Sequence, residues 1–203
     1  MTAVSSSTRA VFAGGHTSQS SPYPVTNLLE FVTIANTSNC TDFGDLDVAA
    51  ANRNGTSNQT RGLIAGGYSP NTRQIDKITI ATLGNAGDFG NLTDGRWGIG
   101  SGSDRTRGVF AGGDSPGDVD TIDFITFSST GNATDFGDLS ANRRYTTGGA
   151  DFTRCLFAGG AAGPVNIIEY VTTQSTGNAI DFGNLTGAKY ANTGAASNGH
   201  GGL

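Results

Sequence analysis

A repeated segment constrains this sequence more than any other feature. The stretch TRGVFAGG, which begins at Thr106, recurs in slightly changed form at Thr8, Thr60 and Thr153, so successive copies start 52, 46 and 47 residues apart. A second landmark, the triplet Asp-Phe-Gly, recurs with nearly the same spacing and begins at Asp42, Asp88, Asp135 and Asp181. Periods of this length are typical of architectures that arrange one small unit several times.

The length of the unit varies mainly in one place. From Gly15 to Leu29, between the double glycine and an alternating apolar stretch, is a step of 14 residues, and the other three units take steps of 8 or 9. A segment whose length is free is predicted to be a surface loop, and surface loops often carry binding specificity.

Strands, not helices, are predicted to build the unit. The stretch from Ile122 to Phe127 alternates with period two and is rich in β-branched and aromatic residues, as a half-buried strand requires. Gly131-Asn132 then predicts a two-residue hairpin turn, after which the chain returns as NATDFGDL. We therefore expect four short strands per unit, for example at residues 97–103, 107–111, 122–128 and 133–139.

Four short strands in 46 to 47 residues are the pattern of a propeller blade. The expected fold is an all-β, four-bladed β-propeller formed by a single repeat domain, residues 1–203, and a solenoid is the less favoured alternative. The units cover approximately residues 8–59, 60–105, 106–152 and 153–198, and residues 199–203 align with the start of a fifth unit.

The first strand of the unit occurs five times, once more than a closed ring of four needs. Either residues 2–7 or residues 190–196 could complete the first blade. We favour the C-terminal copy, because it would join the two ends of the chain and cover a sheet edge. The N-terminal copy would then be loose or would pair with a neighbouring subunit.

The repeat resembles that of kelch β-propellers. The shared features are the double glycine that closes the second strand, the apolar third strand and a basic residue after the fourth strand, seen at Arg96, Arg143 and Lys189. The sequence TRGVFAGG, followed by GNATDFGDL, is also similar to Gly-rich kelch-like repeats in predicted structural and tail-associated proteins of aquatic phages. These resemblances imply a propeller in a virion and bring no catalytic residues with them.

Composition excludes several classes of protein. No apolar run approaches the 18 or more residues needed to span a bilayer, and the first residues lack the long apolar stretch of a signal peptide. The formal net charge is −5 and the chain has no run of lysine or arginine, so we expect no nucleic acid partner. We expect neither membrane insertion nor secretion by a cleaved signal.

The repeated charged residues are predicted to be structural. Asp-Phe-Gly is also a kinase motif, but here it occurs four times at blade spacing, so we expect a buried Phe, a Gly with an unusual backbone angle and an Asp that bonds nearby backbone. A repeated arginine, at Arg9, Arg61, Arg107 and Arg154, is expected to pair with Asp42, Asp88, Asp135 and Asp181 and so to lock the blades. The alternative is a ring of guanidinium groups that binds an anion.

Binding residues are expected in the variable loops and among the aromatic residues. The candidates are His16, Tyr23, Tyr68, Asp114, Trp97 and Tyr190. Aromatic rings could stack on the faces of sugars, although packing between blades would explain Trp97 and Tyr190 equally well. Neither histidine has a partner at metal-ligand spacing. We therefore expect no catalytic residue, no metal and no cofactor.

The function we expect is that of a non-catalytic structural or attachment protein of a phage or virus-like particle. Its partners would be other virion proteins or further copies of itself, and its loops would bind a receptor such as a host surface glycan. A stand-alone carbohydrate-binding propeller is the alternative.

Overall fold

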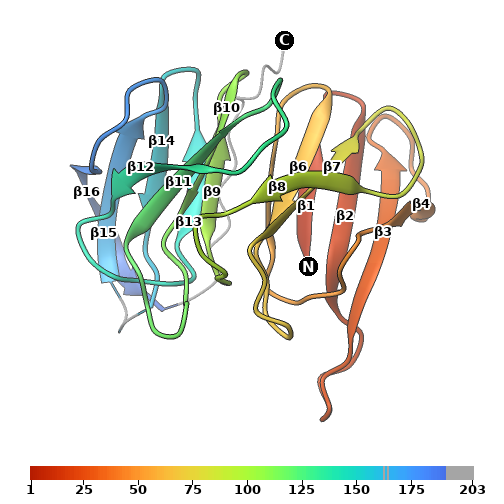
Figure 1. Cartoon of the computed structure of the whole chain (residues 1–203), viewed down its shortest axis with the longest axis horizontal. Helices are drawn as coiled ribbons and strands as arrows, with labels where there is room; N and C mark the ends of the chain where they lie inside the picture. Colours follow the sequence, from red (N-terminus) through yellow and green to blue (C-terminus); the bar gives the residue numbers. More distant parts are fainter. Residues whose placement is uncertain (162, 164, 191–203) are drawn as a thin grey trace.

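Sixteen strands form four antiparallel, four-stranded sheets in the computed structural model, which describes residues 1–161, 163 and 165–190 (Figure 1). Each sheet takes its four strands in chain order, and we call each sheet a blade. No helix occurs among the described residues, so the all-β prediction is confirmed for this part of the chain.

The strand bounds repeat from blade to blade. The first blade comprises β1 (Thr2–Ser5), β2 (Arg9–His16), β3 (Val25–Thr33) and β4 (Thr41–Asp45). The second comprises β5 (Asn54–Ser57), β6 (Arg61–Ala65), β7 (Gln74–Thr79) and β8 (Gly87–Asn91). The third comprises β9 (Gly100–Ser103), β10 (Arg107–Ala111), β11 (Thr121–Thr126) and β12 (Thr134–Asp138). The fourth comprises β13 (Thr147–Ala150), β14 (Arg154–Ala158), β15 (Val165–Thr172) and β16 (Ile180–Lys189).

The blades are arranged like those of a propeller, but the described part of the ring is open. The inner strands β1, β5, β9 and β13 follow one another, and each packs against the next. Three hydrophobic cores lie between successive blades, and the described residues contain none between the fourth blade and the first. The first and fourth blades lie on opposite sides of the view in Figure 1.

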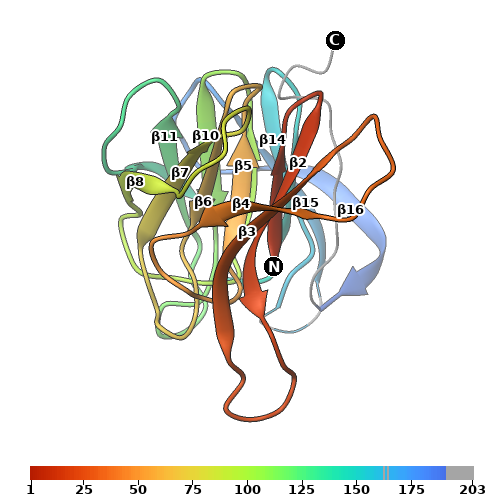
Figure 2. The same ribbon diagram turned by 90° about the vertical axis from the view of Figure 1, so that its right-hand side faces the viewer.

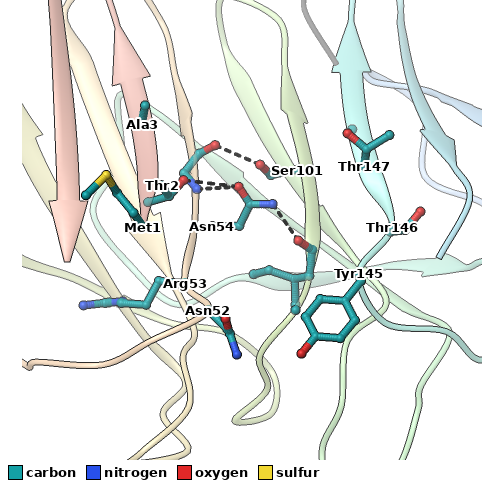
Figure 3. Close-up of a pocket in the computed structure, with 14 residues that line it drawn as sticks. Met1, Thr2, Ala3, Asn52, Arg53, Asn54, Ser101, Tyr145, Thr146 and Thr147 are labelled. Atoms are coloured by element: carbon teal, nitrogen blue, oxygen red, sulfur yellow. Dashed lines mark hydrogen bonds between the residues drawn. The ribbon is translucent and has the colours of Figure 1, made fainter. Parts of the chain in front are cut away.

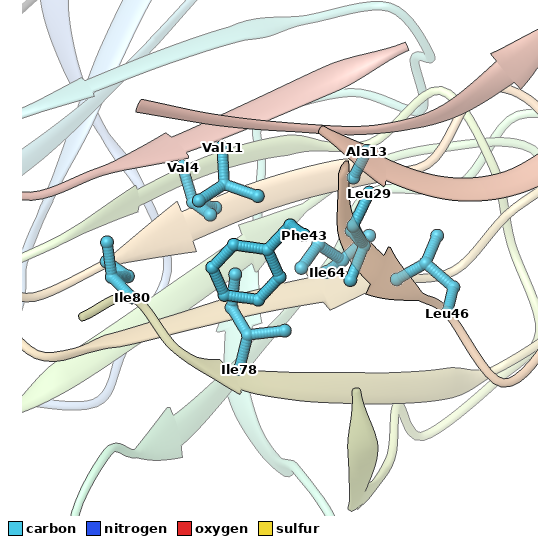
Figure 4. Close-up of a cluster of buried hydrophobic side chains, with 9 residues drawn as sticks. All are labelled: Val4, Val11, Ala13, Leu29, Phe43, Leu46, Ile64, Ile78 and Ile80. Carbon is cyan, nitrogen blue, oxygen red and sulfur yellow. The ribbon is translucent and has the colours of Figure 1, made fainter. Parts of the chain in front are cut away.

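The apolar core is therefore divided among the junctions between blades. Figure 4 shows the first junction, where Phe43 of the first blade lies among Ile64 and Ile78 of the second. The second and third blades each contribute the side chains of one face to one junction and those of the other face to the next. Such a core allows few large side chains, which agrees with a chain that is 35% hydrophobic.

The Phe and the Gly of the Asp-Phe-Gly triplet have their predicted structural roles in the first three blades. Its Phe forms a β-bulge opposite the third strand, and Phe43, Phe89 and Phe136 are buried. Its Gly has a left-handed backbone, with φ of 143° at Gly137, and a Cβ there would lie 2.5 Å from the backbone of Gly177 in the next blade. Only glycine permits so close a contact.

The Gly-Asn pair was predicted to form a two-residue hairpin turn, and that prediction is wrong. The turn lies earlier, where Ser129 N donates to Thr126 O over 3.1 Å. Gly131 N donates instead to the Phe89 carbonyl of the preceding blade over 2.8 Å, and Asn132 Oδ1 accepts from Asn91 N over 3.1 Å. The Gly-Asn pair therefore joins two blades, because it runs beside the bulged fourth strand of the preceding blade.

The repeated arginines also join blades, although not through the predicted aspartates. Arg9 donates to the Ile80 carbonyl over 2.8 Å, Arg107 donates to the Thr173 carbonyl over 3.2 Å, and Arg61 makes the equivalent bond to Phe127. The triplet's aspartate is occupied locally in the first blade, where Asp42 Oδ1 accepts from Gly44 N over 3.1 Å. An acceptor at the end of the next blade's third strand replaces the expected carboxylate.

Three buried ion pairs that the sequence analysis missed hold the linkers, the segments that connect successive blades. Each pair joins a linker to the blade that follows it. Arg53 lies 2.7 Å from Asp76, Arg96 lies 3.0 Å from Asp123, and Arg143 pairs with Glu169. All these side chains are buried. A signal was present, because an acidic residue occupies the second position of the alternating stretch in every unit, at Glu30, Asp76, Asp123 and Glu169.

The N-terminal copy of the first strand, and not the C-terminal copy, completes the first blade. β1 pairs with β2 from Thr2 opposite Ala13 to Ser5 opposite Ala10, which corrects our preference. Residues 191–196 of the C-terminal copy lie outside the described part of the chain, so the predicted closure by that copy is not shown.

We expect Arg96→Ala to destabilise the protein by roughly 3 to 5 kcal/mol, because the substitution leaves Asp123 buried without its counter-ion. Urea unfolding followed by circular dichroism measures the loss. Arg105→Ala is the control, because it removes a guanidinium from an exposed position and should change stability by less than about 0.5 kcal/mol. Similar losses in both variants would contradict this account of the ion pair.

Candidate functional site

A cavity of about 470 Å³ lies between the inner strands of the four blades (Figure 3). Its wall consists mainly of backbone and small polar side chains, among them Thr2, Asn54, Ser101 and Thr147. Neighbouring strands are linked across this wall, since Asn54 Nδ2 donates to the Ile99 carbonyl over 2.6 Å and Ser101 Oγ donates to the Gly55 carbonyl over 2.8 Å. The side chains that line the cavity are therefore largely occupied in holding the inner strands together.

One residue in each of the three linkers lies at the edge of this cavity with a left-handed backbone. Asn52, Gly98 and Tyr145 have φ of 51°, 65° and 56°. A chain of backbone hydrogen bonds connects them, because Gly98 N donates to Asn52 O over 3.1 Å and Tyr145 N donates to Gly98 O over 2.6 Å. Asn and Gly accept this conformation readily, whereas a bulky residue does so at a cost. Tyr145 is thus held at the rim by its surroundings.

Three aromatic rings from three different blades meet beside this rim, and we call them the aromatic cluster. Tyr68 follows the double glycine after β6, Trp97 precedes β9, and Tyr145 precedes β13. The ring centroids of Tyr68 and Trp97 are 5.3 Å apart, and those of Trp97 and Tyr145 are 5.5 Å apart. Partial burial raises the pKa of Tyr145, so its hydroxyl remains a neutral hydrogen-bonding group.

Arg144 ties the aromatic cluster to the loop of the third blade. Its guanidinium carbon lies 5.5 Å from the centroid of Trp97, and its Nη1 lies 2.8 Å from Asp114 and 2.7 Å from Asp118. Burial alone would lower the pKa of Arg144, but the two carboxylates and the Tyr190 side chain raise it above its usual value. The cation is therefore permanently charged and neutralised by its neighbours.

The structure brings together most of the predicted binding residues. Tyr68 and Trp97 belong to the aromatic cluster, Asp114 contacts Arg144 beside it, and Tyr190 lies next to that arginine. Asp118 and Arg144 were missed, because the loop lengths do not show that their side chains meet.

His16 and Tyr23 form a separate feature. β2 and β3 of the first blade continue to the pair His16 and Val25, so the loop between them extends beyond the rest of the molecule (Figure 2). His16 Nδ1 lies 3.1 Å from the Tyr23 carbonyl, and the Tyr23 side chain is exposed. This hairpin is a second potential contact surface on the chain.

Groups that could hold a metal ion are absent from the described residues, since no three His, Cys, Asp or Glu side chains come together there. The same residues contain no helix that is long and apolar enough to cross a membrane. No protein-family model matches the chain, and a search of curated proteins finds no similar sequence.

We expect Arg144→Leu to lower stability by about 1 kcal/mol, because it leaves Asp114 and Asp118 close together without their shared cation. The emission of Trp97, which is the single tryptophan, should shift to the red as its ring becomes more exposed. Chemical unfolding and fluorescence measure the two effects. An Arg105→Leu control should change neither, and an unchanged Trp97 spectrum in Arg144→Leu would contradict the described cluster.

Proposed function

We propose that the chain is a non-catalytic structural and attachment protein of a phage or virus-like particle, with a kelch-like propeller scaffold that carries a loop-mediated binding face. The observation that carries this proposal is the meeting of Tyr68, Trp97 and Tyr145, from three blades, at one rim. The resemblance of the repeat to those of phage particle proteins supports a role in a particle. The aromatic cluster supports a role in attachment.

The charges near the cluster support binding over catalysis. Arg144 is paired with Asp114 and Asp118, so its cation serves to position rings and loops. The cavity next to the cluster is lined mainly by backbone, hydroxyl and amide groups. Its lining also includes Met1 and Arg53, whose guanidinium is paired with buried Asp76. A surface of aromatic faces with hydrogen-bonding groups around them suits a neutral, hydroxyl-rich ligand such as a glycan.

A stand-alone carbohydrate-binding propeller is the second candidate, and the same rings favour it. Four equivalent sites per chain would be expected of a fully symmetric lectin. The repeat position of Trp97 is occupied by Ala51, Arg144 and Tyr190 in the other copies, so the four positions are chemically different. Both candidates therefore predict one glycan site per chain at the aromatic cluster, and they differ in whether the chain works within a larger assembly.

Titration with a panel of host-surface glycans, followed by Trp97 fluorescence, tests the attachment role. We expect saturable binding of one equivalent, and Tyr68→Ala should weaken it at least about tenfold because stacking area is lost. Phe152→Ala is the control, since Phe152 is exposed and lies outside the cluster.

Tyr23→Ala distinguishes the cluster from the hairpin loop of the first blade. If only Tyr23→Ala weakens binding, the contact surface is the hairpin. If the panel contains no ligand for the wild-type chain and immobilised glycans retain none of it, the attachment role is wrong.

A further inference from the structure

The fourth blade exposes the surface that the other three blades bury. Phe43, Phe89 and Phe136 are 3%, 1% and 3% exposed, whereas Phe182, at the same repeat position, is 52% exposed. Leu185 is half-buried where its equivalents Leu46, Leu92 and Leu139 are buried. This outer face of the fourth blade is half of a hydrophobic junction.

The first blade exposes the complementary half. At the end of the third strand, Ile80 and Phe127 are 0% and 2% exposed because each packs against the preceding blade, whereas Ile34 is 55% exposed. Phe12 and Val32 are half-buried, although their equivalents Phe110 and Ile125 belong to the core between the second and third blades. The two open faces thus carry the two sides of the same repeated junction.

The backbone at these faces is shaped for the same contact. A Cβ on Gly137 would collide with the backbone of Gly177, whereas a Cβ on Gly183 of the fourth blade would meet nothing within 4 Å. Gly183 nevertheless has the same left-handed φ of 141°. The segment that would fill this place is Ser38-Asn39 of the first blade, which is exposed and aligns with the Gly-Asn pairs of the other units.

Polar groups at the two faces are also complementary. Arg154 lies over the Tyr170 ring at 4.5 Å, as Arg107 lies over Phe124, and Arg107 also bonds a carbonyl of the next blade. The acceptor at the matching position for Arg154 is the Ile34 carbonyl. In the same alignment Lys189 occupies the position of Arg143, which pairs with buried Glu169. The residue that corresponds to Glu169 in the first blade, and so the expected partner of Lys189, is Glu30.

We propose that the fourth blade of one chain docks on the first blade of a second copy, and so forms across two molecules the junction that occurs three times within one. Phe182 would pack against Ile34, and Arg154 and Lys189 would meet the Ile34 carbonyl and Glu30 of the other copy. In this proposal, the partner in the assembly described under the proposed function is a second copy of the chain. The contact itself is argued from the two faces, and only its biological purpose rests on the proposed function.

A second copy suits these faces better than the other end of the same chain. The three internal junctions are closely packed and hydrogen-bonded through the backbone, yet β1 and β13 lie on different sides of the cavity (Figure 3). Closing the ring would require those junctions to change, whereas a second copy leaves them intact. Because the two faces differ, the association is head-to-tail, and each added copy presents a new open face.

Light scattering during size exclusion tests the proposal on the full chain at increasing concentration. We expect masses that rise from 20.6 kDa towards multiples of it. Phe182→Asp and Ile34→Asp should each remain monomeric, and both should fold, because both positions are exposed. Phe152→Asp, a change at another exposed phenylalanine, should associate like the unchanged chain.

Mixing the two monomeric variants gives the decisive measurement. The Phe182→Asp chain keeps an intact first blade, and the Ile34→Asp chain keeps an intact fourth blade, so the mixture should form a dimer that grows no further. The exposed Cys40, next to Ser38-Asn39, should then lose reactivity with maleimide in the Phe182→Asp chain, while Cys155 stays buried.

The proposal is overturned if the full chain remains monomeric at every concentration, or if the mixed variants do not form a dimer. A monomeric chain that still binds glycans at Trp97 would refute this interface and leave the attachment role intact. A chain that assembles but binds no glycan would support this interface and refute the attachment role.

Discussion

The contact between a left-handed glycine in one blade and the Gly-Asn backbone of the next is the constraint on which this structure depends. At Gly44 and Gly137 a Cβ would lie 2.5 Å from backbone atoms of the neighbouring blade. This approach lets Gly84 N donate to Phe43 O and Gly177 N donate to Phe136 O, at 2.8 and 2.7 Å. Blades are thus joined by main-chain hydrogen bonds at their outer edges as well as by apolar contacts.

That close junction explains how a chain with few large apolar residues holds its fold. The core is divided into three thin layers, and each layer is closed at the outer edge by the bulged Phe, as with Phe89. Buried pairs such as Arg96 with Asp123 hold the linker at the other end of the blade. The same division makes the two end blades incomplete, because half of each end junction has no partner within the described chain.

The strand pattern was largely predictable, because local alternation and turn residues act over a few positions. The predicted strand at residues 107–111 coincides with β10 (Arg107–Ala111), and the buried Phe and the unusual backbone angle of the Gly in the triplet were also expected. The partners of Arg107 and Asn132 were not predictable, since both reach into another blade across many residues of chain. The aromatic cluster was predictable in part: Trp97 and Tyr68 were candidates, but their contact depends on how the segment before β9 passes the loop between β6 and β7.

The repeated four-stranded blade, the positions of its loops and the small residues that its close contacts require can be derived from the amino-acid pattern alone, because those properties depend on residues near one another in the chain. Three outcomes became visible only in three dimensions: which blades share a junction, which copy of the first strand fills the first blade, and the meeting of Tyr68, Trp97 and Tyr145. Those outcomes depend on the angle between successive blades. That angle results from many packing contacts between residues about one repeat apart, so no local sequence pattern encodes it.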